Sequence, residues 1–265
     1  METAPTTGAV ALPDEIIAAV RRGELKKMVK WLRKEGNADA QDADGNTLLH
    51  VAVGQGQPDF IRELVKRNAS MDVPNNDGGT ALMAACQLGA HVEIELLLNN
   101  SADVNWQNAR GDTALHTAAA HDKPGALSQL LDASATIDMQ STDGYSALMT
   151  AAGAGADKCV RRLLDAGAST ELENNLGQTA LRCAEIKGRA STQLLLQRAS
   201  SCTPPDSPSE LAPDAVLLRT KDGRRVHVPA ASLKPRAAAA CTESQKSTRR
   251  CLHRAAGLLA RDMRD

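Results

Sequence analysis

Aromatic residues are scarce in this chain of 265 residues, which holds two Trp, one Tyr and one Phe, together 2% of the sequence. Aromatic rings supply much of the buried area of ordinary globular cores, so their scarcity argues against one large core of that kind. Ala and Leu dominate the 42% of residues that are hydrophobic. This balance favours thin layers of closely packed helices, in which Ala lets backbones approach and Leu fills the gaps.

Several functional motifs are missing as well. The six Cys form no Cys-x-x-Cys pair, which argues against a disulfide framework or a compact zinc site. No basic region followed by an apolar run begins the chain, and no run of about 18 apolar residues occurs. We therefore expect no signal peptide, no membrane span, reduced thiols and a cytosolic or nuclear location. Without a Ser/His/Asp spacing or a phosphate-binding glycine loop, we expect no enzyme, no metal and no cofactor.

Charge is unevenly distributed, although the net charge is only −1. Residues 41–200 carry 12 basic and 19 acidic groups, a net charge of −7. Residues 211–265 carry 12 basic and 5 acidic groups, a net charge of +7. The chain therefore has an acidic body and a basic tail, which differ in the partners that they suit.

A 33-residue period organises most of the sequence. Five units of this kind follow one another, at about residues 42–74, 75–107, 108–140, 141–173 and 174–200. A fixed period of this length predicts stacked supersecondary units and not one core around a pocket. Five columns recur in every unit: Gly45, Gly78, Gly111, Gly144 and Gly177; Thr47, Thr80, Thr113, Ser146 and Thr179; Leu49, Leu82, Leu115, Leu148 and Leu181; Ala52, Ala85, Ala118, Ala151 and Ala184; Leu64, Leu97, Leu130, Leu163 and Leu196.

Each column has a physical reason. The Gly supplies positive φ in a tight turn. The Thr or Ser two positions later suits a helix N-cap, where a hydroxyl that accepts a free backbone N–H adds about 1 kcal/mol. The Leu and Ala columns, three positions apart, lie on one face of the first helix. We expect two further helix stops in the units, one at Gly56, Gly89, Asp122, Gly155 and Gly188 and one at Asn68, Ser101, Ser134 and Gly167.

The stretches Asn46-Thr47-Leu48-Leu49-His50 and Asp112-Thr113-Ala114-Leu115-His116 show the pattern most fully. Together with the period, they resemble the ankyrin repeat and its Thr-Pro-Leu-His signature. The Pro is absent from all five units, and Met83, Met149 and Arg182 replace the His in three. The resemblance implies an all-α repeat fold, an α-solenoid of helix–turn–helix units with β-hairpin fingers, over about residues 13–200. It also implies that His50 and His116 hydrogen-bond the backbone of their turns.

The sequence divides into five parts. We expect disorder in residues 1–12, a capping half-repeat in residues 13–41 with helices that begin at Asp14 and near Glu24, and five repeats in residues 42–200. In the second of the two helices in residues 13–41, an apolar face is expected to point inward. Residues 201–214 form a Pro/Ser linker, where Thr203 and Ser207 are candidate phosphorylation sites. Residues 215–265 form a short irregular basic tail, with a β-hairpin around Asp222-Gly223 and a short helix over residues 247–265.

The resemblance also implies where a partner would bind. In such stacks the concave face, built from finger tips and first helices, usually contacts the partner. Because Trp, Tyr and Arg dominate binding hot spots, Trp106, Arg110, His121 and Tyr145 are the strongest candidates, with packing between fingers as the alternative for Trp106. Asn105 is a candidate for hydroxylation by an oxygen-dependent dioxygenase. By position in the repeat, the predicted contacts are Asp44, Asn46, Asp77, Gln87, Leu88, Trp106, Arg110, Asp112, His121, Thr142, Asp143, Tyr145 and Gln178.

The sequence therefore favours a monomeric, non-catalytic protein–protein interaction module or adaptor. Its acidic finger tips suit a partner segment of basic or mixed charge. The alternative is binding of nucleic acid or an anionic surface through the basic tail. The tail contains no aromatic residue, which argues against base stacking and makes nucleic acid the less favoured ligand.

Overall fold

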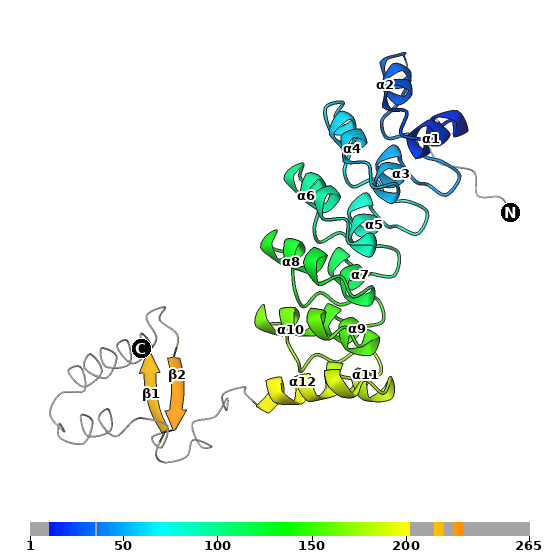
Figure 1. The fold of residues 1–265 in the computed structure, drawn as a ribbon. Coiled ribbons are helices and arrows are strands. Elements are labelled where there is room, and N and C mark those ends of the chain that lie inside the picture. The colour runs from blue at the N-terminus through cyan, green and yellow to red at the C-terminus, as the bar shows by residue number, and fades with distance from the viewer. Residues whose placement is uncertain (1–10, 35, 202–214, 220–224, 230–265) are drawn as a thin grey trace. The chain divides into compact units, whose positions relative to one another are not determined.

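The computed structural model describes residues 11–34, 36–201, 215–219 and 225–229 of the chain. The chain divides into two parts, residues 1–201 and residues 202–265. The described residues of the first part form helical hairpins that stack in sequence order (Figure 1). The helices are α1 (Asp14–Arg21), α2 (Leu25–Lys34), α3 (Leu48–Gly54), α4 (Pro58–Val65), α5 (Ala81–Leu88), α6 (His91–Asn99), α7 (Ala114–Ala120), α8 (Pro124–Asp132), α9 (Ala147–Ala154), α10 (Asp157–Asp165), α11 (Ala180–Ile186) and α12 (Ala190–Ser201).

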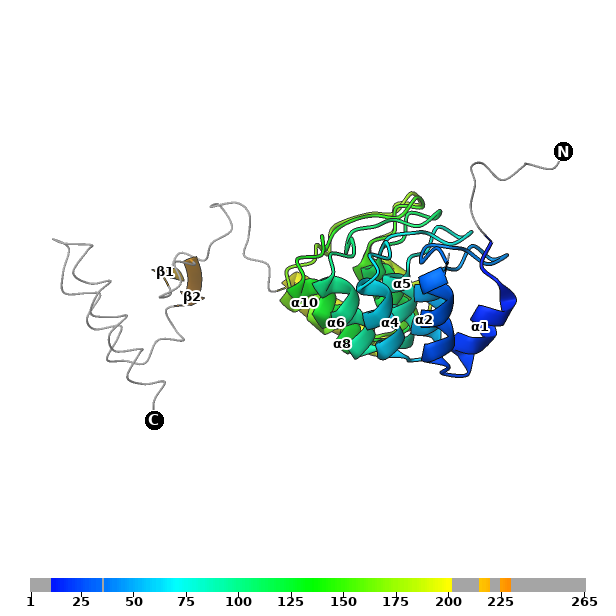
Figure 2. The same ribbon diagram turned by 90° about the horizontal axis from the view of Figure 1, so that it is seen from above.

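The stack has two helical layers, one of odd-numbered and one of even-numbered helices (Figure 1). Between consecutive hairpins the chain forms fingers that project to one side of the helices (Figure 2). The fingers turn tightly and carry single β-bridges, such as Gln41–Thr47 and Gln140–Ser146, in place of regular strands. The predicted α-solenoid is confirmed, and no helix in the described ranges is long and apolar enough to cross a membrane.

One continuous apolar core runs through the stack, from Leu12 to Leu196. The repeated Leu and Ala columns form it: Leu49, Leu82, Leu115 and Leu148 are each at most 1% exposed. Burying a Leu side chain stabilises the fold by about 1.5–3 kcal/mol, so each unit is stable chiefly through contact with its neighbours.

The predicted helix stops are confirmed. Every repeated Gly has positive φ, and so do the four residues other than Gly at these stops, Asn68, Ser101, Asp122 and Ser134. At Gly144 the next finger adds a second constraint, because a Cβ there would lie 2.7 Å from the backbone nitrogen of Asn175. Gly177 lies in the last unit of the described stack, with no described finger beyond it, and the nearest described atom to an added Cβ is 3.9 Å away.

The N-cap prediction holds in only part of the stack. Ser146 and Thr179 accept hydrogen bonds from backbone N–H groups at 3.3 and 3.4 Å, as expected. In the first and third units the Thr forms a capping box with a His, and its hydroxyl also contacts the His ring nitrogen, at 3.0 Å for Thr47 and 2.9 Å for Thr113. The Thr80 hydroxyl is buried without a partner in the described structure, where Met83 stands in the position of that His.

The first helix pair differs from the expectation in its packing. Leu12 is buried, and its N–H donates to the Gln41 carbonyl at 2.9 Å, although we expected disorder through residue 12. In α2 only Met28 is buried. The other side chains expected to point inward are half-buried, because no unit precedes this helix in the described stack: Leu25, Val29, Trp31 and Leu32.

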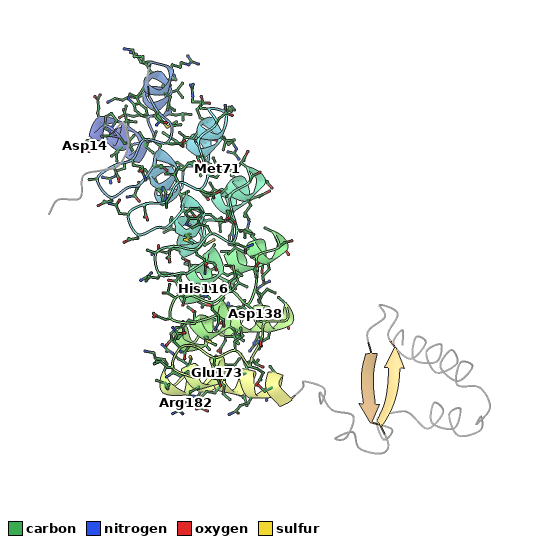
Figure 3. The ribbon with its side chains drawn as sticks, turned by 180° about the vertical axis from the view of Figure 1, so that it is seen from behind. Asp14, Met71, His116, Asp138, Glu173 and Arg182 are labelled. Carbon is green, nitrogen blue, oxygen red and sulfur yellow. The ribbon has the colours of Figure 1, made fainter. Side chains whose placement is uncertain are left out.

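The last unit ends the stack with charge. Arg182 occupies the repeat position of His50 and Met83, and Glu185 occupies that of Val53. His50, Met83 and Val53 are all buried. The Arg182 guanidinium and the Glu185 carboxylate form an exposed ion pair at 2.9 Å. Figure 3 shows Arg182 at the C-terminal end of the stack, opposite Asp14. Positions that are apolar or His in inner units are therefore charged in the last unit of the described stack.

In the second part of the chain, β1 (Ala215–Arg219) and β2 (Arg225–Pro229) pair antiparallel, with Leu217 opposite His227. The two strands of the expected hairpin are therefore formed. The predicted turn, the linker with Thr203 and Ser207, and the helix over residues 247–265 lie outside the described residues.

Candidate partner-binding surface

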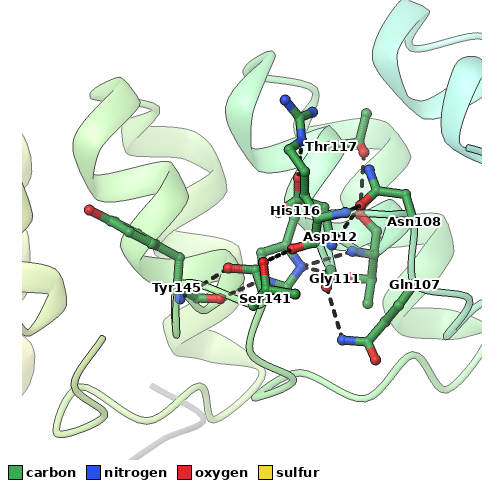
Figure 4. Close-up of polar contacts among 11 residues, drawn as sticks. Gln107, Asn108, Gly111, Asp112, His116, Thr117, Ser141 and Tyr145 are labelled. Atoms are coloured by element: carbon green, nitrogen blue, oxygen red, sulfur yellow. Dashed lines mark hydrogen bonds and ion pairs between the residues drawn. The ribbon is translucent and has the colours of Figure 1, made fainter. Parts of the chain in front are cut away.

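The finger tips are shaped by a column of side chains that the sequence reasoning missed. Asn108 accepts hydrogen bonds through Oδ1 from the backbone N–H groups of Arg110 and Asp112, both at 2.9 Å (Figure 4). Such Asx turns hold the backbone in a tight loop. The same pair of bonds recurs at Asp42, Asn75 and Asn174. In these four units the conformation of the finger tip is thus fixed by bonds within the unit itself.

A column of Gln side chains ties neighbouring fingers together. The Gln107 amide donates to the carbonyl of Gly111 in its own finger at 2.9 Å and to that of Gln140 in the next at 3.1 Å. Gln41 and Gln140 make the same two bonds in their units. The fingers therefore form one connected wall.

The repeated His also joins two units. His116 Nδ1 accepts from the Thr113 backbone N–H at 3.1 Å, so Nε2 carries the proton and donates to the Tyr145 carbonyl at 2.8 Å (Figure 4). Burial lowers the pKa of the His116 imidazole, and the Tyr145 carbonyl partly opposes this shift. His50 makes the equivalent bond to Gly79, and burial lowers its pKa too. Both rings are structural groups, as the resemblance implied.

A groove of about 590 Å³ runs between the finger wall and the first helices. We call it the finger groove. Its lining comes from consecutive units: Arg21, Asp42, Asp44, Asn46, His50, Val51, Gly54, Gln55, Asn75, Asp77, Gly79, Thr80, Met83, Ala84, Gln87, Asn108, Arg110, Asp112, His116, Thr117, Ala120, His121 and Thr150.

Carboxylates give the groove its charge, and they differ in their partners. Asp112 pairs with the Arg110 guanidinium at 3.2 Å, and Asp42 accepts from backbone N–H groups of its own turn. Within the described residues, the exposed carboxylates of Asp44 and Asp77 have neither an ion pair nor a side-chain hydrogen bond. The wall near the first two units thus presents two exposed carboxylates without an ion pair, and Arg21 is the basic residue of the lining at this end.

The architecture and the sequence pattern have a match among known families. The family model for ankyrin repeats, described as three copies, matches residues 16–108, 56–140, 90–171 and 115–206. The chain belongs to the ankyrin-repeat family. A comparison with curated proteins finds no match. Ankyrin repeats generally serve as protein–protein interaction modules and are typically non-catalytic.

The ankyrin stack brings together seven of the thirteen predicted contact residues. These line the finger groove: Asp44, Asn46, Asp77, Gln87, Arg110, Asp112 and His121. His121 is the exposed C-cap of α7, where Nδ1 lies 3.0 Å from the Thr117 carbonyl. The other six are outside the lining: Leu88, Trp106, Thr142, Asp143, Tyr145 and Gln178.

The four strongest candidates do not form one cluster. Arg110 and His121 line the groove, whereas Trp106 and Tyr145 do not. Trp106 is half-buried, and its indole N–H donates to the Gly78 carbonyl at 2.9 Å, so it bridges two ankyrin repeats. This arrangement corresponds to the alternative interpretation of Trp106. Tyr145 also packs against the core.

Asn105 belongs to another inter-repeat column. Its Oδ1 accepts from the Thr136 backbone N–H at 2.8 Å. Asp39, Asp72 and Asp138 make the same bond to the next finger in their units. The Asn105 side chain therefore links repeats, and its hydroxylation stays a prediction.

The described residues offer little for metal or nucleophile chemistry. No group of three or more His, Cys, Asp or Glu within them could hold a metal ion. Burial raises the pKa of the Cys86 thiol to about 12 and is the main cause of a similar rise at Cys159. Thiols of this kind stay protonated and unreactive near neutral pH.

Proposed function

We propose that this ankyrin-repeat protein is a monomeric, non-catalytic adaptor of the cytosol or nucleus that holds a segment of a protein partner in the finger groove. The observation that carries the proposal is the groove itself, which draws its lining from the fingers and first helices of consecutive repeats. A groove shared by consecutive repeats suits an extended or helical segment of a protein.

The rigidity of the wall supports the same function. Gln clamps, the bond from His116 to Tyr145, and finger-to-finger backbone bonds such as Ala109 N–H to the Asp77 carbonyl (3.2 Å) hold it in one conformation. A partner then binds without the entropy cost of ordering the surface, which improves affinity. Exposed groove side chains such as Gln87 and His121 are left to make the contacts.

A blocking variant tests the proposal. Arg at the exposed groove positions Gln87 and Ala120 should fill the groove, whereas Arg at the exposed positions Asn99 and Gln197 adds the same charge outside its lining. Full-length wild type and both double variants would be used for affinity capture and quantitative mass spectrometry, after thermal melts show equal stability. Proteins retained by wild type and Asn99→Arg/Gln197→Arg should be lost from Gln87→Arg/Ala120→Arg. Equal capture by all three would show that the groove is not the binding surface.

A further inference from the structure

One finger-tip column changes its chemistry along the stack. Its members in units 1, 2 and 4 are the exposed acids Asp44, Asp77 and Asp143. Arg110 in unit 3 is neutralised by its ion pair with a neighbouring carboxylate. In unit 5 the column ends with Leu176, which is 73% exposed. The surface therefore passes from acidic to apolar.

A column on the first helices ends in the same way. Arg21, Gly54, Gln87 and Ala120 line the groove at successive 33-residue steps. Two further steps lead to Ile186, at the end of α11, which is 52% exposed. By this spacing, Ile186 and the finger tip at Leu176 border the same face of unit 5. Large apolar side chains exposed together are typical of interaction sites.

The acidic end also contains an unsatisfied buried group. Thr80 lines the groove beside the tips of units 1 and 2 and is 1% exposed, and its Oγ1 has no hydrogen-bond partner in the described structure. The hydroxyl lacks the His ring that serves its counterparts in units 1 and 3. That hydroxyl is itself covered, so the exposed, unpaired carboxylates of Asp44 and Asp77 are the groups that make this part of the groove favourable for donors with positive charge.

We infer that the partner segment is itself divided, with Lys or Arg side chains at one end and large apolar side chains at the other. The basic end lies along Asp44 and Asp77, and the apolar end packs between Leu176 and Ile186. This inference rests on the proposed function. It adds the chemistry of the bound segment and the orientation in which that segment lies along the stack. The charged end speeds association and gives binding a salt dependence, whereas the apolar end does not respond to salt in this way.

Random 16-residue peptides displayed on phage and selected on the full-length protein provide the probe. Selected peptides should carry clustered Lys or Arg at one end and Leu, Ile, Phe or Met at the other. Fluorescence anisotropy with the synthetic peptides would then compare two variants with matched controls. Asp44→Lys/Asp77→Lys is matched by Glu95→Lys/Asp132→Lys, which are exposed acids outside the groove lining. Leu176→Ser/Ile186→Ser, which lie beyond the groove lining on the two columns that end in unit 5, is matched by Val92→Ser/Leu194→Ser, which are about half exposed and lie outside both the lining and these columns.

We expect each of the two test variants to weaken binding by about tenfold or more, and its control by less than about twofold. Peptides shortened at the basic end should lose the response to Asp44→Lys/Asp77→Lys and keep the response to Leu176→Ser/Ile186→Ser. Selected peptides without this division, or with both ends sensitive to the same variant, would overturn the inference while leaving the groove as the site. Peptides that respond only to the control variants, or a selection that yields no binder, would overturn the proposed function itself.

Discussion

Replacing Gly144 by Ala should destabilise the stack far more than the same change at Gly177. Both residues have positive φ, 79° and 67°, so Ala costs about 1–2 kcal/mol at either position. At Gly144 the new Cβ would also stand 2.7 Å from the Asn175 backbone nitrogen. Moving the fingers apart would break the bond from that N–H to the Asp143 carbonyl, 3.1 Å long. The lost bond and the overpacking add about 2–4 kcal/mol.

We therefore expect a total of about 3–6 kcal/mol for Gly144→Ala and about 1–2 kcal/mol for Gly177→Ala. Urea unfolding of the full-length variants, followed by circular dichroism, would measure the difference. Because end repeats can unfold apart from the rest, Gly144→Ala should also open α11 and α12 first, visible as faster hydrogen exchange there. Equal losses in the two variants would refute the reasoning, since only the contact with the next finger distinguishes the two sites.

Two further predictions concern the His column. Burial lowers the pKa of His50 and His116, so the unfolded chain binds protons more readily and stability should fall as pH drops below about 6.5. In His50→Met/His116→Met the urea midpoint should change less between pH 7.5 and 5.5 than it does in wild type. An equal change of the midpoint in both proteins would contradict this. Conversely, Met83→His should raise the free energy of unfolding by about 1 kcal/mol. The new imidazole can form hydrogen bonds both to the unpartnered hydroxyl of Thr80 and to the backbone of the next finger. A lower melting temperature than wild type would contradict that account.

The sequence predicted the parts of the fold that depend on one unit. Helix stops at Ser101, Asp122 and Ser134 followed from their place in the 33-residue period, although none is Gly, and each of these residues has positive φ in the structure. The burial of the Leu and Ala columns followed from helical spacing. These features are local, so each unit contributes an independent copy of the same signal.

Contacts between units were harder to predict. The Gln column bonds to carbonyls one period away, and nothing in the local sequence shows how closely the fingers approach. The recurrence of Gln41, Gln107 and Gln140 at multiples of 33 residues was the available signal. For Trp106, residue type and finger position left partner contact and packing between fingers both open, and the bond from its indole N–H to the Gly78 carbonyl could not be read from the sequence.

The ion pair between Arg182 and Glu185 has a consequence for assembly. A repeat presents one face to the unit before it and another to the unit after it, so identical molecules could in principle add head to tail without closure, as fibres do. At the C-terminal end such growth would desolvate both charges against an apolar surface, at a cost of several kcal/mol per ion. The pair thus opposes filament formation at this end, and Arg182→Met with Glu185→Ala would remove that barrier.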